Sequence, residues 1–197
     1  MADYRALETI SDVLMRLLQA SYERADFDDQ RLRFAVFQGD DFQSNDLNAG
    51  VSLFLYRIAA NGTYRTPPGR RTGDGSRRKT QLPIDLHYLI TIWAKSAPMQ
   101  HRIAGWVMRT LEDTPVLPSG LLHGARPDVF GPDETVEVVL NDLTNEDLFR
   151  IWDILEEPYR LSIPYLVRNV RIESGETLQA AEPVDERIFE LLDARSR

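Results

Sequence analysis

The stretch QLPIDLHYLITIWAKSAPMQHRIAGWVMRTLED, from Gln81 to Asp113, decides the fold of this chain. Its first half alternates two sets of side chains, as a pleated strand does. One set is Leu82, Ile84, Leu86, Tyr88, Ile90 and Ile92, and the other is Asp85, His87, Leu89, Thr91 and Trp93. Because both sets contain large apolar residues, the pattern predicts an internal strand, covered on both faces over its second half.

A helix is predicted directly after this strand. Ser96-Ala97-Pro98 breaks the strand, and Pro98 suits the first helical position, where no amide donor is needed. Asp113-Thr114-Pro115 ends the helix, since the residue before a proline avoids the helical region. The apolar residues that would fold this helix back onto the strand recur at helical spacing: Met99, Ile103, Trp106, Val107 and Leu111.

Composition bounds the class of protein. The chain has 197 residues, 43% of them hydrophobic and 27% charged, which fits one soluble globular domain. No apolar run approaches the roughly 20 residues of a membrane-spanning helix, and the N-terminus has no secretory signal. The chain contains no cysteine, which excludes thiolate chemistry and fits a reducing compartment. A net charge of −8 argues against nucleic-acid binding, so we expect a cytoplasmic protein that binds neither membrane nor nucleic acid.

Further elements are predicted on both sides of the central stretch. Before it we expect a helix from an Asp3 N-cap to about Ala20, a strand over 31–36, a loop over 39–48 and an interior strand over Gly50–Ile58. After it we expect a short edge strand at Val116–Leu117, an irregular segment over 118–133, a strand over 134–140, a helix over 144–155 and a long strand over 159–173. Thr144 and Asp147 resemble a capping box for that last helix. Pro164 would place its part of the long strand at an edge or bulge.

This order of elements predicts an α+β (mixed α/β) fold, with a central mixed sheet flanked by helices. A single domain would occupy residues 1–175, with a flexible basic loop inserted at 65–81. Residues 176–197 form an acidic tail, which we interpret as a short helix or a partner-binding arm.

The basic loop, RTPPGRRTGDGSRRKTQ, is the most unusual segment. It contains no apolar residue that could anchor it in a core, so we expect it to be mobile. Asp74 is its only acid, and its bases are the candidate partner-interface residues Arg65, Arg70, Arg71, Arg77, Arg78 and Lys79. Two interpretations stay open: a solvated, disordered insertion, or an arm that orders against an acidic partner surface.

Asp85 and His87 are neighbours on one strand face and form the only candidate catalytic pair. They are either a base with its orienting carboxylate or a polar pair at a strand end or subunit interface. The second interpretation is favoured, because no nucleophile motif such as G-x-S-x-G accompanies them.

No motif predicts a metal or cofactor site. The three histidines, His87, His101 and His123, lack metal-ligand spacing. The acids of the 39–48 loop lack the glycine and the terminal Glu of a calcium loop, and the glycines of the basic loop match no phosphate-binding motif. We therefore expect a protein without catalytic residues, cofactor or metal.

Five segments in order resemble a known family: GVSLFLYRI (50–58), LPIDLHYLITIWA (82–94), HRIAGWVMRTLEDTPVL (101–117), LTNEDLFRIWDIL (143–155) and PYRLSIPYLVRNVRIES (158–174). Together they resemble the cap, or tail-terminator, proteins of phage-tail-like contractile injection systems, of the antifeeding-prophage and Photorhabdus virulence cassette type. The resemblance covers roughly residues 5 to 175. Its most specific parts are the central strand and the late P-Y-R-L-S-x-x-Y strand.

The resemblance implies a structural protein rather than an enzyme. Such proteins form a ring, expected to be a homo-hexamer, on the distal end of the inner tube and sheath, where they end both polymers and stabilise the extended sheath. The implied partners are further copies of the chain, the inner tube protein and the sheath protein. Two alternatives stay open: a protein-binding adaptor that is not at a particle end, and a hydrolase that uses Asp85 and His87.

Overall fold

The computed structural model describes residues 2–44, 47–63, 70–71, 77–176 and 178, without the side chains of 70, 71, 77 and 78. The helical elements are α1 (Ala6–Ser21), the 3-10 helix η1 (Arg24–Phe27), α2 (Asp41–Ser44), α3 (Ala97–Asp113), α4 (Ser119–Ala125) and α5 (Asn145–Leu155). The strands are β1 (Arg33–Phe37), β2 (Gly50–Ala60), β3 (Arg70–Arg71), β4 (Arg77–Arg78), β5 (Leu82–Trp93), β6 (Val116–Leu117), β7 (Val136–Leu140) and β8 (Ser162–Ile172).

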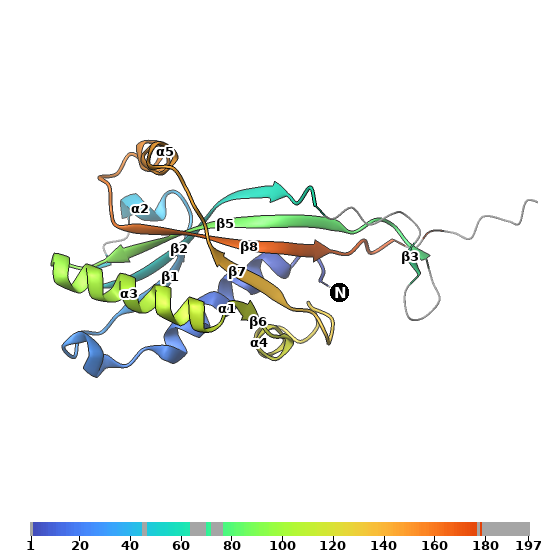
Figure 1. Ribbon diagram of the computed structural model, residues 1–197, viewed down its shortest axis with the longest axis horizontal. Coiled ribbons are helices and arrows are strands. Elements are labelled where there is room, and N and C mark those ends of the chain that lie inside the picture. Colours follow the sequence, from blue (N-terminus) through green and yellow to red (C-terminus); the bar gives the residue numbers. More distant parts are fainter. Residues whose placement is uncertain (1, 45–46, 64–69, 72–76, 177, 179–197) are drawn as a thin grey trace, which may run out of the picture.

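Six of these strands form one mixed sheet in the order β1-β2-β5-β8-β7-β6. The β1–β2 pair is parallel, and every other pair in this sheet is antiparallel. The long strands β2, β5 and β8 lie side by side at its centre (Figure 1). The predicted α+β fold, a mixed sheet flanked by helices, is confirmed.

The central strand is covered on both faces, as its two apolar sets predicted. Ile84, Leu86, Tyr88, Ile90 and Ile92 are buried in a first core, together with residues of α1, α3 and α4. The opposite face contributes Leu89 and Trp93 to a second core under α2 and α5, whose buried members are Phe37, Phe42, Leu47, Leu89, Trp93, Trp152 and Leu155. Figure 1 shows α1 and α3 on one side of the sheet and α2 and α5 on the other.

Buried hydrogen bonds tie β5 to α1 and to β2 and so help to fix the position of this strand. The Tyr88 hydroxyl lies 2.9 Å from Ser11 Oγ of α1, and Trp93 Nε1–H donates to Ser52 Oγ of β2 at 2.8 Å. Burial raises the pKa of the Tyr88 hydroxyl to about 12, so the phenol stays protonated in the core.

The sequence predicted the ends of α3 and α5 correctly. The first of these helices follows Ser96, has Pro98 in its first turn and stops at Asp113, one residue before Thr114. The second begins after Thr144, whose hydroxyl accepts the Asp147 backbone N–H at 3.1 Å and donates to the Asp147 carboxylate at 2.7 Å. The capping box is therefore present, although its acid binds the hydroxyl.

Three local predictions are wrong. Asp3 is not the N-cap of α1, because its carboxylate accepts the Arg5 N–H at 2.7 Å and the helix begins at Ala6. The predicted 39–48 loop contains the short helix α2, which brings Phe42 into the second core. The predicted irregular segment 118–133 contains α4, which buries Leu122.

Pro164 illustrates how a proline is accommodated inside a sheet. β8 is an interior strand, between β5 and β7, and Pro164 is paired with Leu89 of β5. On the other side, β7 has already ended at Leu140, which is opposite Tyr165, and the Asn141 N–H donates to the Pro164 carbonyl at 3.0 Å. The missing donor therefore faces the end of β7, so the expectation of a local edge is confirmed within an interior strand.

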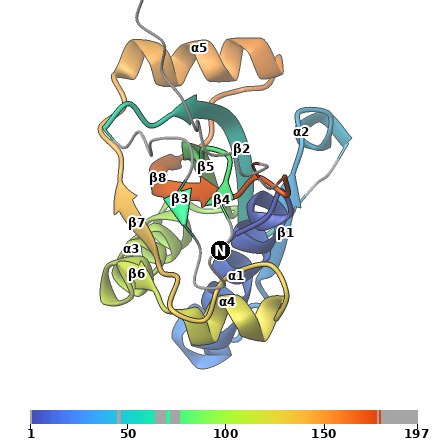
Figure 2. The ribbon, with the colours of Figure 1, turned by 90° about the vertical axis from the view of Figure 1, so that its right-hand side faces the viewer.

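The three central strands continue past the helices toward β3 and β4, at the end of the molecule opposite α5 (Figure 1). Figure 2 looks along the strands from that end, with β3 and β4 in front of the sheet. In the described part of the chain, no helix has the length and apolar character needed to cross a membrane.

Candidate partner interface

The basic loop is partly described. Arg70 and Arg71 of β3 pair antiparallel with Arg78 and Arg77 of β4, so the loop contains a short hairpin. Arg65, residues 66–69 and residues 72–76 lie outside the described residues, as do the predicted mobility of the loop and the predicted helix of the acidic tail.

Lys79 links the base of this hairpin to the beginning of the tail. Its ammonium forms an ion pair with the Glu176 carboxylate, and its backbone N–H lies 3.4 Å from the Glu176 carbonyl. The hydrogen bond from Lys79 lowers the pKa of Glu176. Both side chains are exposed, so the pair adds little stability, but it places the base of the basic hairpin next to Glu176, at the start of the tail.

Asp85 has a structural use in the sheet. Opposite it, β8 carries an extra residue, since Ile84 is paired with Val170 but Leu86 is paired with Val167. The bulge gives Asn169 a left-handed φ of 57°, and the Asn169 N–H donates to Asp85 Oδ1 at 2.8 Å. The Asn61 side chain donates to the same oxygen at 2.9 Å. The carboxylate therefore holds the bulge and the end of β2 together.

His87 lies beside a second bulge, in β2, where Tyr56 is the extra residue between Leu55 and Arg57. The rings of His87 and Tyr56 are 5.9 Å apart. Burial, and then the nearby Arg57 charge, lower the pKa of His87, while Asp85 acts weakly in the other direction. A base oriented by its carboxylate would instead depend on a contact between Asp85 and His87, and the Asp85 oxygen is bonded to Asn61 and Asn169.

The depressed pKa of His87 predicts a pH dependence of stability. A histidine that is harder to protonate in the folded state contributes stability above its ordinary pKa of 6.5, and this stability is lost as the pH falls below that value. We expect His87→Gln to lose less stability than the parent between about pH 8 and pH 5 in urea denaturation. The difference should be small because the ring is half-exposed, and equal losses would contradict the assignment.

Metal-ligating side chains do not gather: among the described residues, no three His, Asp or Glu side chains could hold a metal ion together. The feature that the sequence analysis missed is a surface on α5. Phe149 and Ile154 are exposed there, and Tyr159 is exposed just beyond the helix. Both helical residues fall outside the stripe of Leu148, Ile151, Trp152 and Leu155, and that departure was the available signal.

The comparisons with known proteins agree with this architecture. The family model of the Pvc16 N-terminal domain matches residues 9–186. A search of curated proteins gives no significant match.

Two solved structures share the fold. A PVC sheath/tube terminator in the extended state, from an extracellular contractile injection system, is 21% identical over 93% of this chain, with a TM-score of 0.57. The tube-terminating cap of the anti-feeding prophage is 20% identical over 91% of this chain, with a TM-score of 0.58. This chain spans 64% and 60% of the length of those two proteins. On the family match, the chain belongs to the Pvc16 N-terminal domain family.

Proposed function

We propose that this chain is a structural cap, or tail terminator, of a contractile injection system. It would form a ring on the distal end of the inner tube and sheath, end the growth of both polymers and stabilise the extended sheath. The observation that carries the proposal is the shared fold over more than nine-tenths of the chain with two proteins described as tube or sheath terminators. The family match to the Pvc16 N-terminal domain supports it independently.

The geometry supports a docking role over catalysis. The side chain most suited to orient a catalytic histidine, Asp85, bonds two groups that belong to the sheet. A subunit of a ring instead presents two different surfaces, one to each neighbour. Such a head-to-tail contact forms a closed ring when the rotation between successive subunits brings the last one back to the first. The basic hairpin and the exposed α5, which lie far apart along the molecule, are our candidates for these two surfaces (Figure 1). We therefore propose a non-enzymatic protein that assembles in the cytoplasm as part of the particle, with six copies per ring.

Electron microscopy of particles from a strain that lacks this chain tests the function. A terminator sets where the polymers stop, so we expect over-long or ragged tubes and sheaths, and a return to uniform length when the chain is supplied again. Particles of unchanged length and intact distal ends in the deletion strain would refute the proposal.

Deletion of residues 67–79, from Pro67 to Lys79, tests the basic loop as a partner interface. This segment contains no apolar residue that could anchor it in a core, so we expect the unfolding midpoint to change little while ring formation or binding to the sheath weakens. A matched control replaces the same residues with a neutral Gly/Ser chain of equal length, which separates loss of charge from shortening. Unchanged capping and particle length in both variants would contradict the assignment.

A further inference from the structure

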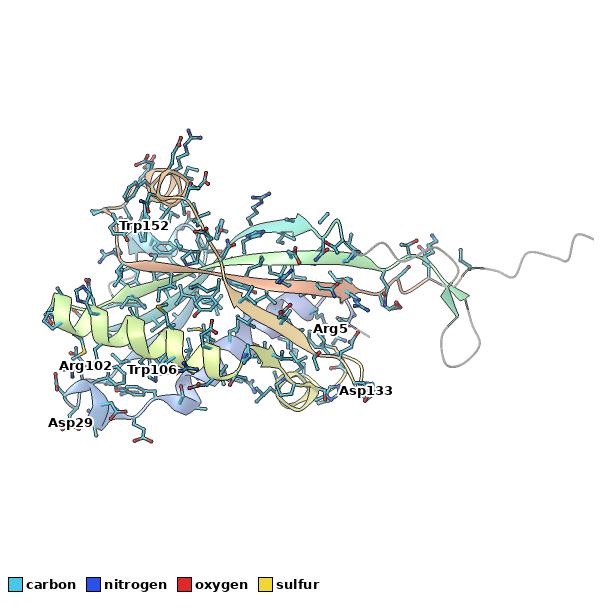
Figure 3. The ribbon with its side chains drawn as sticks, in the orientation of Figure 1. Arg5, Asp29, Arg102, Trp106, Asp133 and Trp152 are labelled. Atoms are coloured by element: carbon cyan, nitrogen blue, oxygen red, sulfur yellow. The ribbon has the colours of Figure 1, made fainter. Side chains whose placement is uncertain are left out.

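The outer surface of α5 combines apolar side chains with acids. Phe149, Ile154 and Tyr159 are 52%, 81% and 50% exposed. Phe149 and Tyr159 contact each other edge to face, with ring centroids 5.6 Å apart. Large aromatic residues held in a fixed exposed arrangement are typical of interface anchors. Figure 3 shows this helix raised above the sheet, with Trp152 pointing down into the second core.

The charge around these residues is negative. Residues 142–160 contain two bases and six acids, which are Asp142, Glu146, Asp147, Asp153, Glu156 and Glu157. One of the two bases, Arg150, is paired with Glu146 at 2.6 Å. The guanidinium of the other base, Arg160, lies over the Trp93 ring, 4.3 Å from its centroid. The acids therefore outnumber the bases in this segment, and its net charge is negative. We call Phe149, Ile154, Tyr159 and these acids the α5 surface.

The opposite end of the molecule has the complementary character. Ile58 near the end of β2 and Leu82 at the start of β5 are 52% and 54% exposed. They lie on the same face of the sheet, because Ile58 is opposite Leu86, which belongs to the same alternating set as Leu82. Beyond them come Lys79 and the four arginines of β3 and β4. We call Ile58, Leu82, Lys79 and these two strands the basic end.

We propose that the basic end of one copy docks on the α5 surface of a second copy. The inference rests on the proposed function and names the two surfaces through which the ring would close. Each surface joins exposed apolar side chains to an excess of charge of one sign. At the basic end Lys79 is already paired with Glu176, so the positive excess there comes from the four arginines of β3 and β4. The two excess charges are opposite in sign, which favours one orientation of approach. Figure 1 shows α5 above the sheet and far along the long axis from β3, so the two surfaces can meet between copies but not within one. Repeating such a head-to-tail contact gives a ring when the rotation closes.

Disulfide cross-linking tests this contact directly, since the chain has no cysteine of its own. We would introduce Leu82→Cys and Ile154→Cys, one in each of two variants, and oxidise them inside particles assembled with the tube and sheath proteins. We expect a covalent dimer only when both variants are present, and a ladder of multimers from the double variant. Met108→Cys on α3, 37% exposed and away from both surfaces, replaces Ile154→Cys in the matched control.

The outcomes separate the contact from the function. Particles that contain the chain and have normal length, but give no more dimer with Ile154→Cys than with Met108→Cys, would overturn the contact and leave the terminator role standing. Particles that lack the chain altogether and still have normal length would overturn the proposed function. If the cross-link persists after residues 177–197 are deleted, the acidic tail is not needed for the contact. If the cross-link is lost, the tail rather than the α5 surface is the binding partner of the basic end, and the proposed contact is overturned.

Discussion

Gly50→Ala should destabilise this chain more than any other single methyl addition at a described glycine. Gly50 opens β2 with φ at 152°, where a side chain is strained, and a Cβ there would lie 2.0 Å from the Arg33 carbonyl oxygen. The obstructing atoms belong to the backbone of β1, so no side chain can rotate away. We expect the free energy of unfolding to fall by about 4 kcal/mol or more, which is the range of core disruption rather than of a surface change.

The loss should be concentrated where β1 joins the sheet. Arg33 and Gly50 are the first pair of the β1–β2 register, and β1 brings Phe37 into the second core beneath α5. Weakening that pair would also loosen the support of the α5 surface. Urea denaturation measures the effect, and the control is Gly105→Ala in α3, where a Cβ meets nothing within 4 Å. That control should be neutral or gain about 0.5–1 kcal/mol from helix propensity. Equal stability of the two variants would contradict the strain argument.

The sequence predicted the parts of the fold that depend on periodicity. The alternation from Leu82 to Trp93 and the helical repeat from Met99 to Leu111 give the observed β5 and α3, because both patterns report which side of an element is buried. It did not predict α2 or α4, since each spans only one or two turns and is held by a single buried residue, Phe42 or Leu122. Such short helices depend on tertiary contacts that have no local pattern.

The candidate site was predicted only in part. A run of arginines without apolar residues is visible in the sequence, so the basic loop could be named as a candidate, and its role as an interface stays a prediction. The acids of the α5 surface are scattered among ordinary helix positions, and their grouping with Tyr159 depends on the turn after the helix, where Glu156 adopts a left-handed φ of 55°. The partners of Asp85 could not be predicted either, because Asn61 and Asn169 are 24 and 84 residues away and meet it only through two strand pairings.

Asp85→Ala should have the second largest effect. The change removes the acceptor of the Asn61 amide and of the Asn169 backbone N–H. Asn169, the left-handed residue of the bulge, is then left partly buried without this hydrogen bond. Hydrogen bonds to a charged group contribute about 1.5–3 kcal/mol, so we expect the free energy of unfolding to fall by about 2–3 kcal/mol. Chemical denaturation measures the loss, and hydrogen exchange should locate it at the ends of β2 and β8.

Asp85→Asn distinguishes a structural carboxylate from a catalytic one. The asparagine keeps an oxygen at the position of Oδ1 that can accept both bonds, so we expect it to recover most of the stability that alanine loses and to leave particle capping unchanged. A carboxylate that orients a histidine base responds differently, because the amide cannot stabilise the charged imidazole and function is lost while folding is kept. Loss of capping in a fully stable Asp85→Asn variant would therefore overturn the structural assignment. If Asp85→Asn keeps both the stability and the particle capping, the role of Asp85 in β5 is structural. It then holds β2 and β8 in the register that positions the basic end.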